Sequence, residues 1–263
     1  MNDYFPQPAP DFGVGFLFLC AVTNKRTMRN TLKLSHRQSN IKIIGVGCGG
    51  NNIVNSLYAS GMNDISLVAC DCDASVLERS KADVKLQLGN DGLGTGGNPN
   101  VGKKTAEEKS ADIRALLGDR TDMAFVVSCL GGGCGTSVAP VVAREARLMG
   151  ITTICVATLP FEFEGTQRFE QSLDGVHEMA KNADGVFLLN NQYIFRQHWD
   201  SPINEAFAQA DEMICNFIRN TIESITKQKK AKREKIGLWR FFRKTFWIRH
   251  NLAYICFFFA RKK

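Results

Sequence analysis

The sequence lacks the features that most quickly define a class of protein. No apolar run reaches the roughly 18–20 residues that a membrane-spanning helix needs, which argues against a conventional transmembrane protein. The nine cysteines include no CxxC pair and the four histidines lie far apart, so no metal site is indicated. The only charged residues before the apolar run at 14–22 are acidic, unlike those before a secretory signal. We therefore expect reduced thiols and a cytoplasmic location.

Charge is distributed unevenly along the chain. Residues 227–263 hold 13 Lys or Arg residues and a single acid, whereas the other 226 residues hold 20 basic and 25 acidic residues. The net charge of +7 therefore describes a short basic tail on a mildly acidic body. We expect no specific nucleic-acid binding, because the excess of positive charge that would favour it lies in the tail alone.

Three segments of the chain differ in periodicity and composition. Residues 1–39 show no clear period and are expected to be a weakly ordered leader. Over 40–227, short apolar runs alternate with helical patterns, which predicts an α/β domain with a parallel sheet covered on both faces. Residues 228–263 mix cations with nine aromatic residues; we expect no folded domain there. The alternative is a segment that contacts a membrane surface.

The alternation gives a specific order of elements. The expected strands lie at 41–46, 66–70, 84–88, 123–129, 151–158 and 185–189. The expected helices lie at about 52 onward, 74–79, 105–117, 138–148, 166–181 and 203–227.

Two glycine-rich loops each connect an expected strand to an expected helix. They read GVGCGGNN at 45–52 and CLGGGCGTS at 129–137. Glycines let a backbone approach a ligand closely, and a helix N-terminus offers free N–H groups to an anion. Each loop alone also suits a tight turn. One loop with Asp71 as a ribose-binding acid would suit a dinucleotide and an NAD-dependent oxidoreductase. Two loops suit a triphosphate better.

A third glycine-rich stretch, at 97–103, imitates a P-loop. Its sequence GNPNVGK fits GxxxxGK, but the next residue is Lys104, where a P-loop needs Ser or Thr for magnesium. The stretch also begins several residues after the expected strand at 84–88. We therefore reject a P-loop.

Eight motifs, in this order, resemble the tubulin/FtsZ family of GTPases over about 41–226. They are IKIIGVGCGGNN, LVACDCDASVL, SKADVKLQLG, GLGTGGNPNVGKK, GGGCGTSVAPVVA, LPFEFEGTQR, LLNNQ and AFAQADEMI. The resemblance implies a Rossmann-like three-layer α/β fold that binds GTP or GDP, with Mg²⁺ able to accompany the nucleotide. It also implies a bacterial, cytoplasmic protein of the division ring, found at the septum when built into filaments.

The resemblance also implies site residues. It places the phosphates against Gly49, Gly50, Asn51, Asn52, Gly94, Gly132, Gly133, Cys134, Gly135 and Thr136. Glu164 and Arg168 match ribose and phosphate contacts, and Asn190, Phe207 and Asp211 match guanine contacts. Read without the family, Glu164 and Arg168 are a surface ion pair, Phe207 is a core residue and Asp211 belongs to a solvated helix face. Cys134 stands where the family usually has threonine, and Cys48 where it has glycine.

The resemblance weakens after the long helix at 203–227. There the family carries a loop with two acids, which acts on GTP held by the neighbouring subunit, and then a second α/β domain. Here the matching stretch reads KQKKAKREKIG, with only Glu234 near an acid position. We therefore expect a chain truncated after its central helix, no catalytic residue of its own, and very weak hydrolysis. Intact FtsZ-like subunits are the expected partners, and a non-hydrolysing regulator or decoy of filaments is the alternative.

Overall fold

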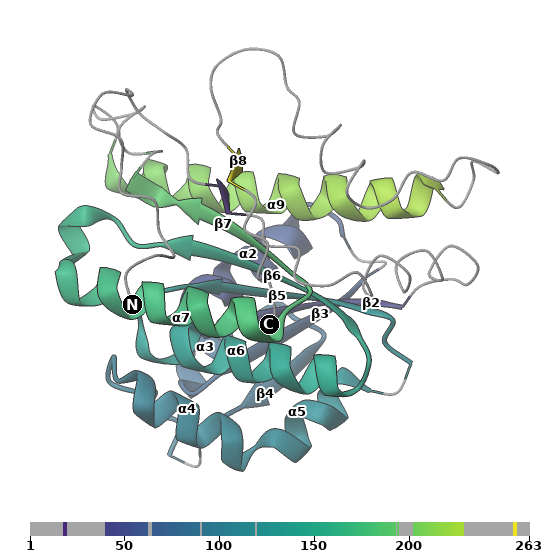
Figure 1. Cartoon of the computed structure of the whole chain (residues 1–263), viewed down its shortest axis with the longest axis horizontal. Coiled ribbons are helices and arrows are strands. Elements are labelled where there is room, and N and C mark those ends of the chain that lie inside the picture. Colours follow the sequence, from purple (N-terminus) through teal and green to yellow (C-terminus); the bar gives the residue numbers. More distant parts are fainter. Residues whose placement is uncertain are drawn as a thin grey trace, which may run out of the picture.

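A six-stranded parallel sheet forms the centre of the fold (Figure 1). The computed structural model describes residues 18–19, 40–62, 65–89, 91–118, 120–192, 194, 202–228 and 255–256. The strand order is β4-β3-β2-β5-β6-β7. The strands are β2 (Ile41–Val46), β3 (Ser66–Asp71), β4 (Val84–Gln87), β5 (Met123–Cys129), β6 (Thr152–Leu159) and β7 (Gly185–Asn190). This confirms the predicted α/β class with a parallel sheet.

Helices cover both faces of the sheet, which makes three layers (Figure 1). One face is packed by α4 (Pro99–Glu108), α5 (Ser110–Leu117), α6 (Gly133–Leu148) and α7 (Thr166–Asn182). The other is packed by α2 (Gly47–Ala59), α3 (Ala74–Arg79) and α9 (Ile203–Gln228). None of the helices in the described ranges is both long and apolar enough to cross a bilayer.

The strands are apolar throughout because both of their faces are buried. In β5, Phe125 and Val127 pack into the core under α2 and α9, while Ala124 and Val126 pack into the core under α6. The same alternation places Ile43 on the first side and Ile44 on the second. A parallel sheet between two helical layers requires such unbroken apolar runs.

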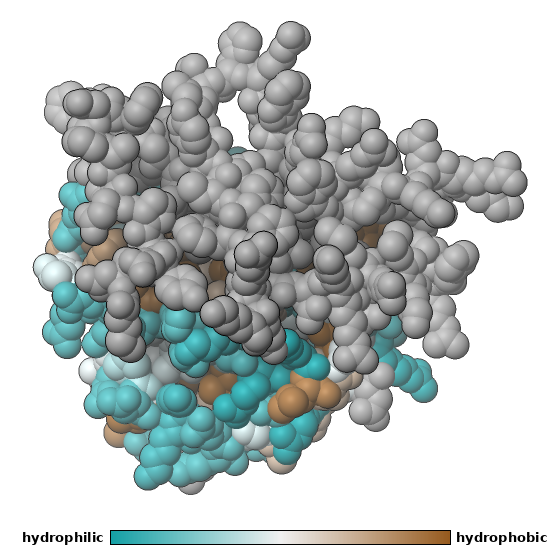
Figure 2. Space-filling model, in the orientation of Figure 1, coloured by the Kyte–Doolittle hydropathy of each residue, from teal (hydrophilic) through white to brown (hydrophobic). Residues whose placement is uncertain are grey.

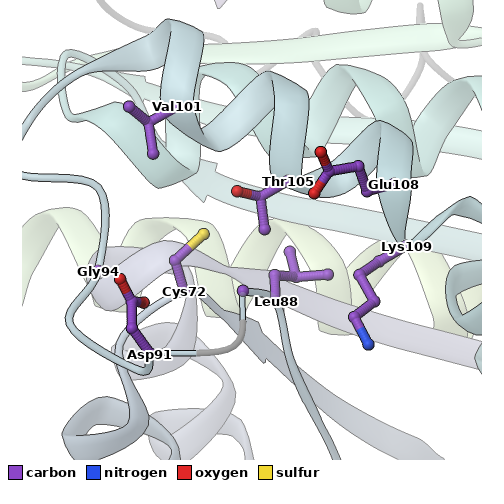
Figure 3. Close-up of a pocket in the computed structure, with 9 residues that line it drawn as sticks. Cys72, Leu88, Asp91, Gly94, Val101, Thr105, Glu108 and Lys109 are labelled. Atoms are coloured by element: carbon purple, nitrogen blue, oxygen red, sulfur yellow. The ribbon is translucent and has the colours of Figure 1, made fainter.

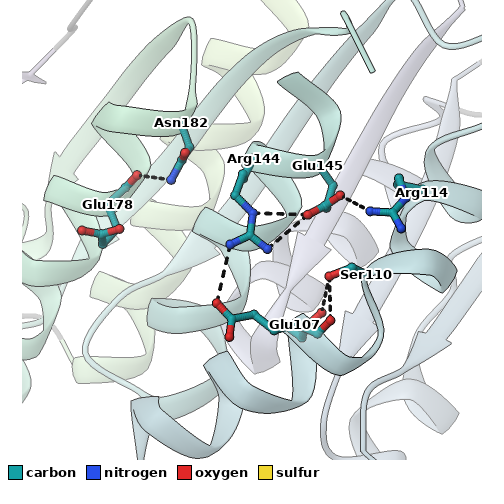
Figure 4. Close-up of polar contacts among 8 residues, drawn as sticks. Glu107, Ser110, Arg114, Arg144, Glu145, Glu178 and Asn182 are labelled. Carbon is teal, nitrogen blue, oxygen red and sulfur yellow. Dashed lines mark hydrogen bonds and ion pairs between the residues drawn. The ribbon is translucent and has the colours of Figure 1, made fainter. Parts of the chain in front are cut away.

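A buried acid ties three helices together on the α4–α7 side. Glu145 of α6 is 2% exposed, and its carboxylate oxygens lie 2.6 Å from Arg114 Nη1 and 3.1 Å from Arg144 Nη2. Arg144 also reaches Glu107 of α4, at 3.5 Å (Figure 4). The buried charge is therefore compensated within the helical layer.

The outer faces of these helices are mainly hydrophilic, with small separate hydrophobic spots (Figure 2).

Little of the leader and the tail falls within the described residues. In the leader these are β1 (Phe18–Leu19), and beyond α9 they are β8 (Ile255–Cys256), which pairs with β1 in parallel. The weakly ordered leader and the absence of a folded tail domain are predictions on residues that otherwise lie outside the described ranges. The same is true of Glu234 and the basic stretch around it.

Three helices begin earlier than the sequence pattern predicts. The expected starts near 52, 105 and 138 are observed at Gly47, Pro99 and Gly133. In each case a glycine-rich stretch that looks like loop forms the first helical turns. For α4 the signal was present, because Asn98 caps the helix and Pro99 takes its first position.

Candidate functional site

The candidate site lies at the carboxyl edge of the sheet, between β2 and β5. From this central pair the chain order runs outward in opposite directions, to β3 and β4 on one side and to β6 and β7 on the other. Ligands of open α/β sheets bind at such a switch point, outside the carboxyl ends of the strands. Both predicted glycine loops leave the sheet here, one from β2 into α2 and the other from β5 into α6.

The two helices that start at this point have no side-chain cap. Val46 and Gly132 occupy the N-cap positions of α2 and α6, and neither makes a side-chain capping bond. Helices α3 and α4 differ, since Asp73 accepts from Ser75 N at the start of α3 and Asn98 from Asn100 N at the start of α4. Helices α5 and α7 also begin without a side-chain cap. The first-turn N–H groups of α2 and α6 thus lack the usual partner, and the helix dipoles favour an anion there.

Close backbone contacts bring the glycine loops into one cradle. Gly47 has φ of +75°, and a Cβ on it would lie 2.9 Å from Gly135 N. A Cβ on Gly133 would lie 2.7 Å from Asn98 N, in the loop before α4. Side chains at either position would push these segments apart. The predicted phosphate residues Gly49 and Gly50 lie in the first turn of α2, and Gly133, Cys134, Gly135 and Thr136 in that of α6.

Side-chain hydrogen bonds hold the β5–α6 turn in shape. Thr136 Oγ1 accepts from Gly131 N at 2.8 Å, and Ser128 Oγ donates to Gly135 O at 2.9 Å. Gly94, predicted near the terminal phosphate, donates its N–H to Cys72 O at 3.1 Å, which fixes its loop to the end of β3. The cradle is therefore preformed by the protein itself.

Asn51 and Asp71 form a buried polar pair beneath the cradle. Asn51 Nδ2 donates to Gly47 O at 3.0 Å and lies 3.3 Å from Asp71 Oδ2, while Asp71 Oδ1 accepts from Asp73 N. Burial raises the pKa of Asp71, and these hydrogen bonds oppose the rise. Asp71 is 3% exposed, so it is poorly placed to hold a ribose, and nothing else favours the oxidoreductase alternative. The neighbouring Asn52 is exposed.

Glu164 and Arg168 flank the cradle on the β6 side. Glu164 Oε1 accepts from Phe161 N at 2.8 Å, and its carboxylate pairs with Arg168 Nη1 at 3.4 Å. The Arg168 side chain is half exposed, and a Cβ on Gly132 would lie 3.8 Å from its Nη2. The predicted ion pair exists, and it places a cation next to the glycine turn of α6.

The three predicted base contacts come from β7 and α9. Asn190 ends β7, and its Oδ1 accepts from Gln192 N at 3.0 Å. The ring of Phe207 contacts that of Phe161 edge to face, with 4.7 Å between the ring centroids. Phe207 is 42% exposed, so its interpretation as a core residue is wrong. Asp211 is only partly exposed, and burial raises its pKa to about 6, so it does not lie on a solvated face.

Two buried acceptors at this edge have no protein donor. Among the described residues, the side-chain oxygens that are buried without a hydrogen-bond partner are Asn51 Oδ1 and Asn191 Oδ1. Both follow the carboxyl ends of sheet strands, β2 and β7. Buried polar atoms rarely remain unpaired, so these two indicate a missing donor such as a ligand or water. Asn191 and the ring of Phe161 were not predicted, although both stand beside predicted residues in the motifs LLNNQ and LPFEFEG.

Fold and site together define the class: a doubly wound α/β domain with two uncapped, glycine-started helices at its switch point. A family model described as the GTPase domain of the Tubulin/FtsZ family matches residues 40–198. The chain belongs to the tubulin/FtsZ family.

Individual relatives agree with this assignment. The cell division protein FtsZ of Porphyromonas gingivalis is 42% identical over 192 residues, which is 72% of this chain and 42% of that protein. FtsZ 1 of Methanocaldococcus jannaschii is 38% identical over 196 residues, 73% of this chain and 54% of that one. A solved structure titled as an empty FtsZ dimer from M. jannaschii matches with a TM-score of 0.69 at 34% identity, over 78% of this chain and 60% of that chain. The chain thus spans about half the length of the curated relatives it matches.

Proposed function

We propose that the carboxyl edge of the sheet binds a guanine nucleotide, GTP or GDP, with its phosphates over the N-termini of α2 and α6. The observation that carries this proposal is the pairing of two uncapped helix starts with three touching glycine loops. Backbone N–H groups supply the donors, so the cysteine at 134 costs one hydroxyl and leaves the rest of the cradle intact. Mg²⁺ would accompany the phosphates, and we assign it no protein ligand.

We propose that the ribose lies near Glu164 and Arg168 and the base near Asn190, Phe207 and Asp211. The exposed Phe207 ring offers a stacking surface, and an ionised Asp211 can accept two N–H donors from guanine that adenine does not offer. Donors from the nucleotide would also relieve the unpaired oxygens of Asn51 and Asn191.

Binding to purified full chain tests this proposal. Calorimetric titration with GTP and ATP in parallel should show clear preference for GTP. Asp211→Ala should weaken GTP binding by about 1–3 kcal/mol, the cost of losing a charged hydrogen-bond partner. Glu212→Ala is the matched control, because Glu212 is exposed and carries the same charge one residue further along α9. Equal affinity for ATP, or equal losses in both variants, would show that the base site is wrongly assigned.

For hydrolysis, we propose that a second FtsZ-like subunit completes the site. Three carboxylates described at this edge already accept hydrogen bonds from the protein: Asp71 from Asn51, Asp73 from Ser75 and Glu164 from Phe161. Because these bonds give each of the three carboxylates a role in holding the loops, we assign none of them as the catalytic base. Near the cradle, Leu93 is 83% exposed and Phe163 is 53% exposed, which suits an apolar contact with another subunit.

Mixing experiments test the proposed partnership. The chain alone should turn over GTP very slowly, and it should do so faster when an intact FtsZ is added. A small molar fraction should shorten FtsZ filaments in sedimentation, which is the behaviour of the regulator alternative. Vigorous turnover by the chain alone would contradict the need for a partner. Incorporation into filaments would place the chain at the division septum of a bacterial cytoplasm.

A further inference from the structure

Gln192 joins two loops at the base end of the site. Its side-chain Oε1 accepts a hydrogen bond from Glu162 N at 3.0 Å, and its own backbone N–H donates to Asn190 Oδ1 at 3.0 Å. Glu162 opens the short 3₁₀ turn η2 (Glu162–Glu164) after β6, whereas Asn190 is the last residue of β7. Gln192 is therefore a clip between the segments that follow two neighbouring strands.

The turn that Gln192 holds also carries other contacts of the base end. Phe161, directly before η2, is fully buried, and its ring contacts that of Phe207 edge to face with 4.7 Å between the centroids. Phe161 N donates to Glu164 Oε1 at 2.8 Å, which fixes the carboxylate that we place near the ribose. The proposed ribose and base contacts thus meet on this one turn.

The clip also fixes the orientation of the Asn190 side chain. A backbone N–H can bond only an acceptor, so Asn190 Oδ1 faces Gln192 and the Nδ2 donor turns away from it. Asn191 lies between the two, and its buried Oδ1 has no donor among the described residues. The end of β7 therefore offers one amide donor and one amide acceptor, both set by the same short loop.

We propose that Gln192 is a positioning residue that sets the preference for guanine over adenine. It holds the amides at the end of β7 in register with the ring of Phe207 and with Glu164. Guanine offers an acceptor at O6 where adenine offers a donor at N6, so amides held in one orientation discriminate between the two bases. This inference rests on the proposed function, and it gives Gln192 no contact with the nucleotide.

The size of the effect follows from one neutral hydrogen bond. Gln192→Met removes the Oε1 acceptor and leaves the bond from the backbone N–H to Asn190 in place. A hydrogen bond of this kind changes an equilibrium about three- to tenfold, so the ratio of GTP to ATP affinity should fall by that factor. Gln192→Glu keeps an acceptor oxygen at the same reach and should keep the wild-type ratio, because its added charge acts on GTP and ATP alike.

The matched control lies at the opposite edge of the sheet. Gln87 ends β4, and its Nε2 also bonds a backbone group, Gly89 O at 3.4 Å. The loop that follows borders a pocket whose lining includes Leu88 and Gly94, at the phosphate end of the site (Figure 3). A change there would alter the affinity for GTP and ATP equally, so Gln87→Met should leave their ratio unchanged.

Amide hydrogen exchange tests the clip without any nucleotide. In the ¹⁵N-labelled full chain, the Glu162 N–H should be protected in wild type and in Gln192→Glu, and it should exchange severalfold faster in Gln192→Met. Circular dichroism confirms that each variant is folded. An unchanged exchange rate in Gln192→Met would overturn the proposal, because the clip would then not form in solution.

Calorimetric titrations with GTP and with ATP on the same samples test the role in specificity. An unchanged affinity ratio in Gln192→Met would refute it, and so would an equal fall in Gln192→Glu or in Gln87→Met. If the wild-type chain binds GTP no better than ATP, the proposed function fails and the role in specificity fails with it. Amide exchange still decides in that case whether Gln192 ties the two loops together.

Discussion

We expect Asp211 to lower the stability of the nucleotide-free protein. Burial raises its pKa from an ordinary 3.8 to about 6, which means that the folded state resists ionising this carboxyl. At 1.36 kcal/mol per pH unit, the difference sets an upper limit of about 3 kcal/mol at neutral pH. Solvent that reaches the partly exposed side chain reduces this figure. We therefore expect Asp211→Asn to raise the free energy of unfolding by about 1–3 kcal/mol at pH 8.

The pH dependence of this gain separates the explanation from others. Below about pH 4, Asp211 is protonated in both folded and unfolded chains, so the penalty is absent. It develops as the pH rises from about 4 through 6, because the unfolded chain then loses its proton more readily than the folded one. Urea unfolding of wild type and Asp211→Asn at pH 4 and pH 8 measures the difference. A gain of the same size at both pH values, or no gain at pH 8, would refute the reasoning.

Further predictions concern binding, the cradle, the helical layer and the tail. If GTP binds ionised Asp211, the affinity of the wild-type chain for GTP should fall about tenfold between pH 7 and pH 5. Calorimetry on Asp211→Asn over the same pH range should show a smaller fall. Gly133→Ala should abolish GTP binding while the circular dichroism spectrum persists, because a Cβ would meet Asn98 N at 2.7 Å; unchanged affinity would contradict the cradle. Arg114→Met should lower the free energy of unfolding by about 1–3 kcal/mol, since Glu145 is left with one fewer partner, and urea titration checks this. Deleting 229–263 should leave GTP affinity unchanged and improve solubility in sedimentation assays; loss of folding would contradict it.

The sheet was predictable because its signal is local. Each strand is a continuous apolar run, and burial on both faces demands nothing more specific than that. The runs at 123–129 and 185–189 therefore agree closely with β5 and β7. The boundaries of the leader and the tail remain predictions, since few of their residues are described.

The base end of the site could not be derived from spacing alone. Phe207 fits the apolar stripe of α9, but its ring is exposed near the start of that helix, where it contacts the ring of Phe161. Asp211 looks like a solvated acid until the packing of α9 on the sheet half-buries it. Such placements depend on where separate elements meet, and here the resemblance to a family supplied the assignment.

The early starts of α2 and α6 and the proposed anion site have one physical origin. Sequence patterns locate a helix start by its capping residue, and α2 and α6 have none: Val46 and Gly132 stand at their N-cap positions. Glycine in the first turn lowers helix propensity further, so both turns look like loop. Yet a capping side chain would occupy the very N–H groups that an anion needs, and a Cβ would fill the space that it enters. At α4, where Asn98 does cap the helix, the early start was readable and no ligand role is proposed for those N–H groups. Because α5 and α7 also lack a side-chain cap, the sign of an anion site here is the combination of missing caps, glycine in both first turns and a common position at the switch point of the sheet.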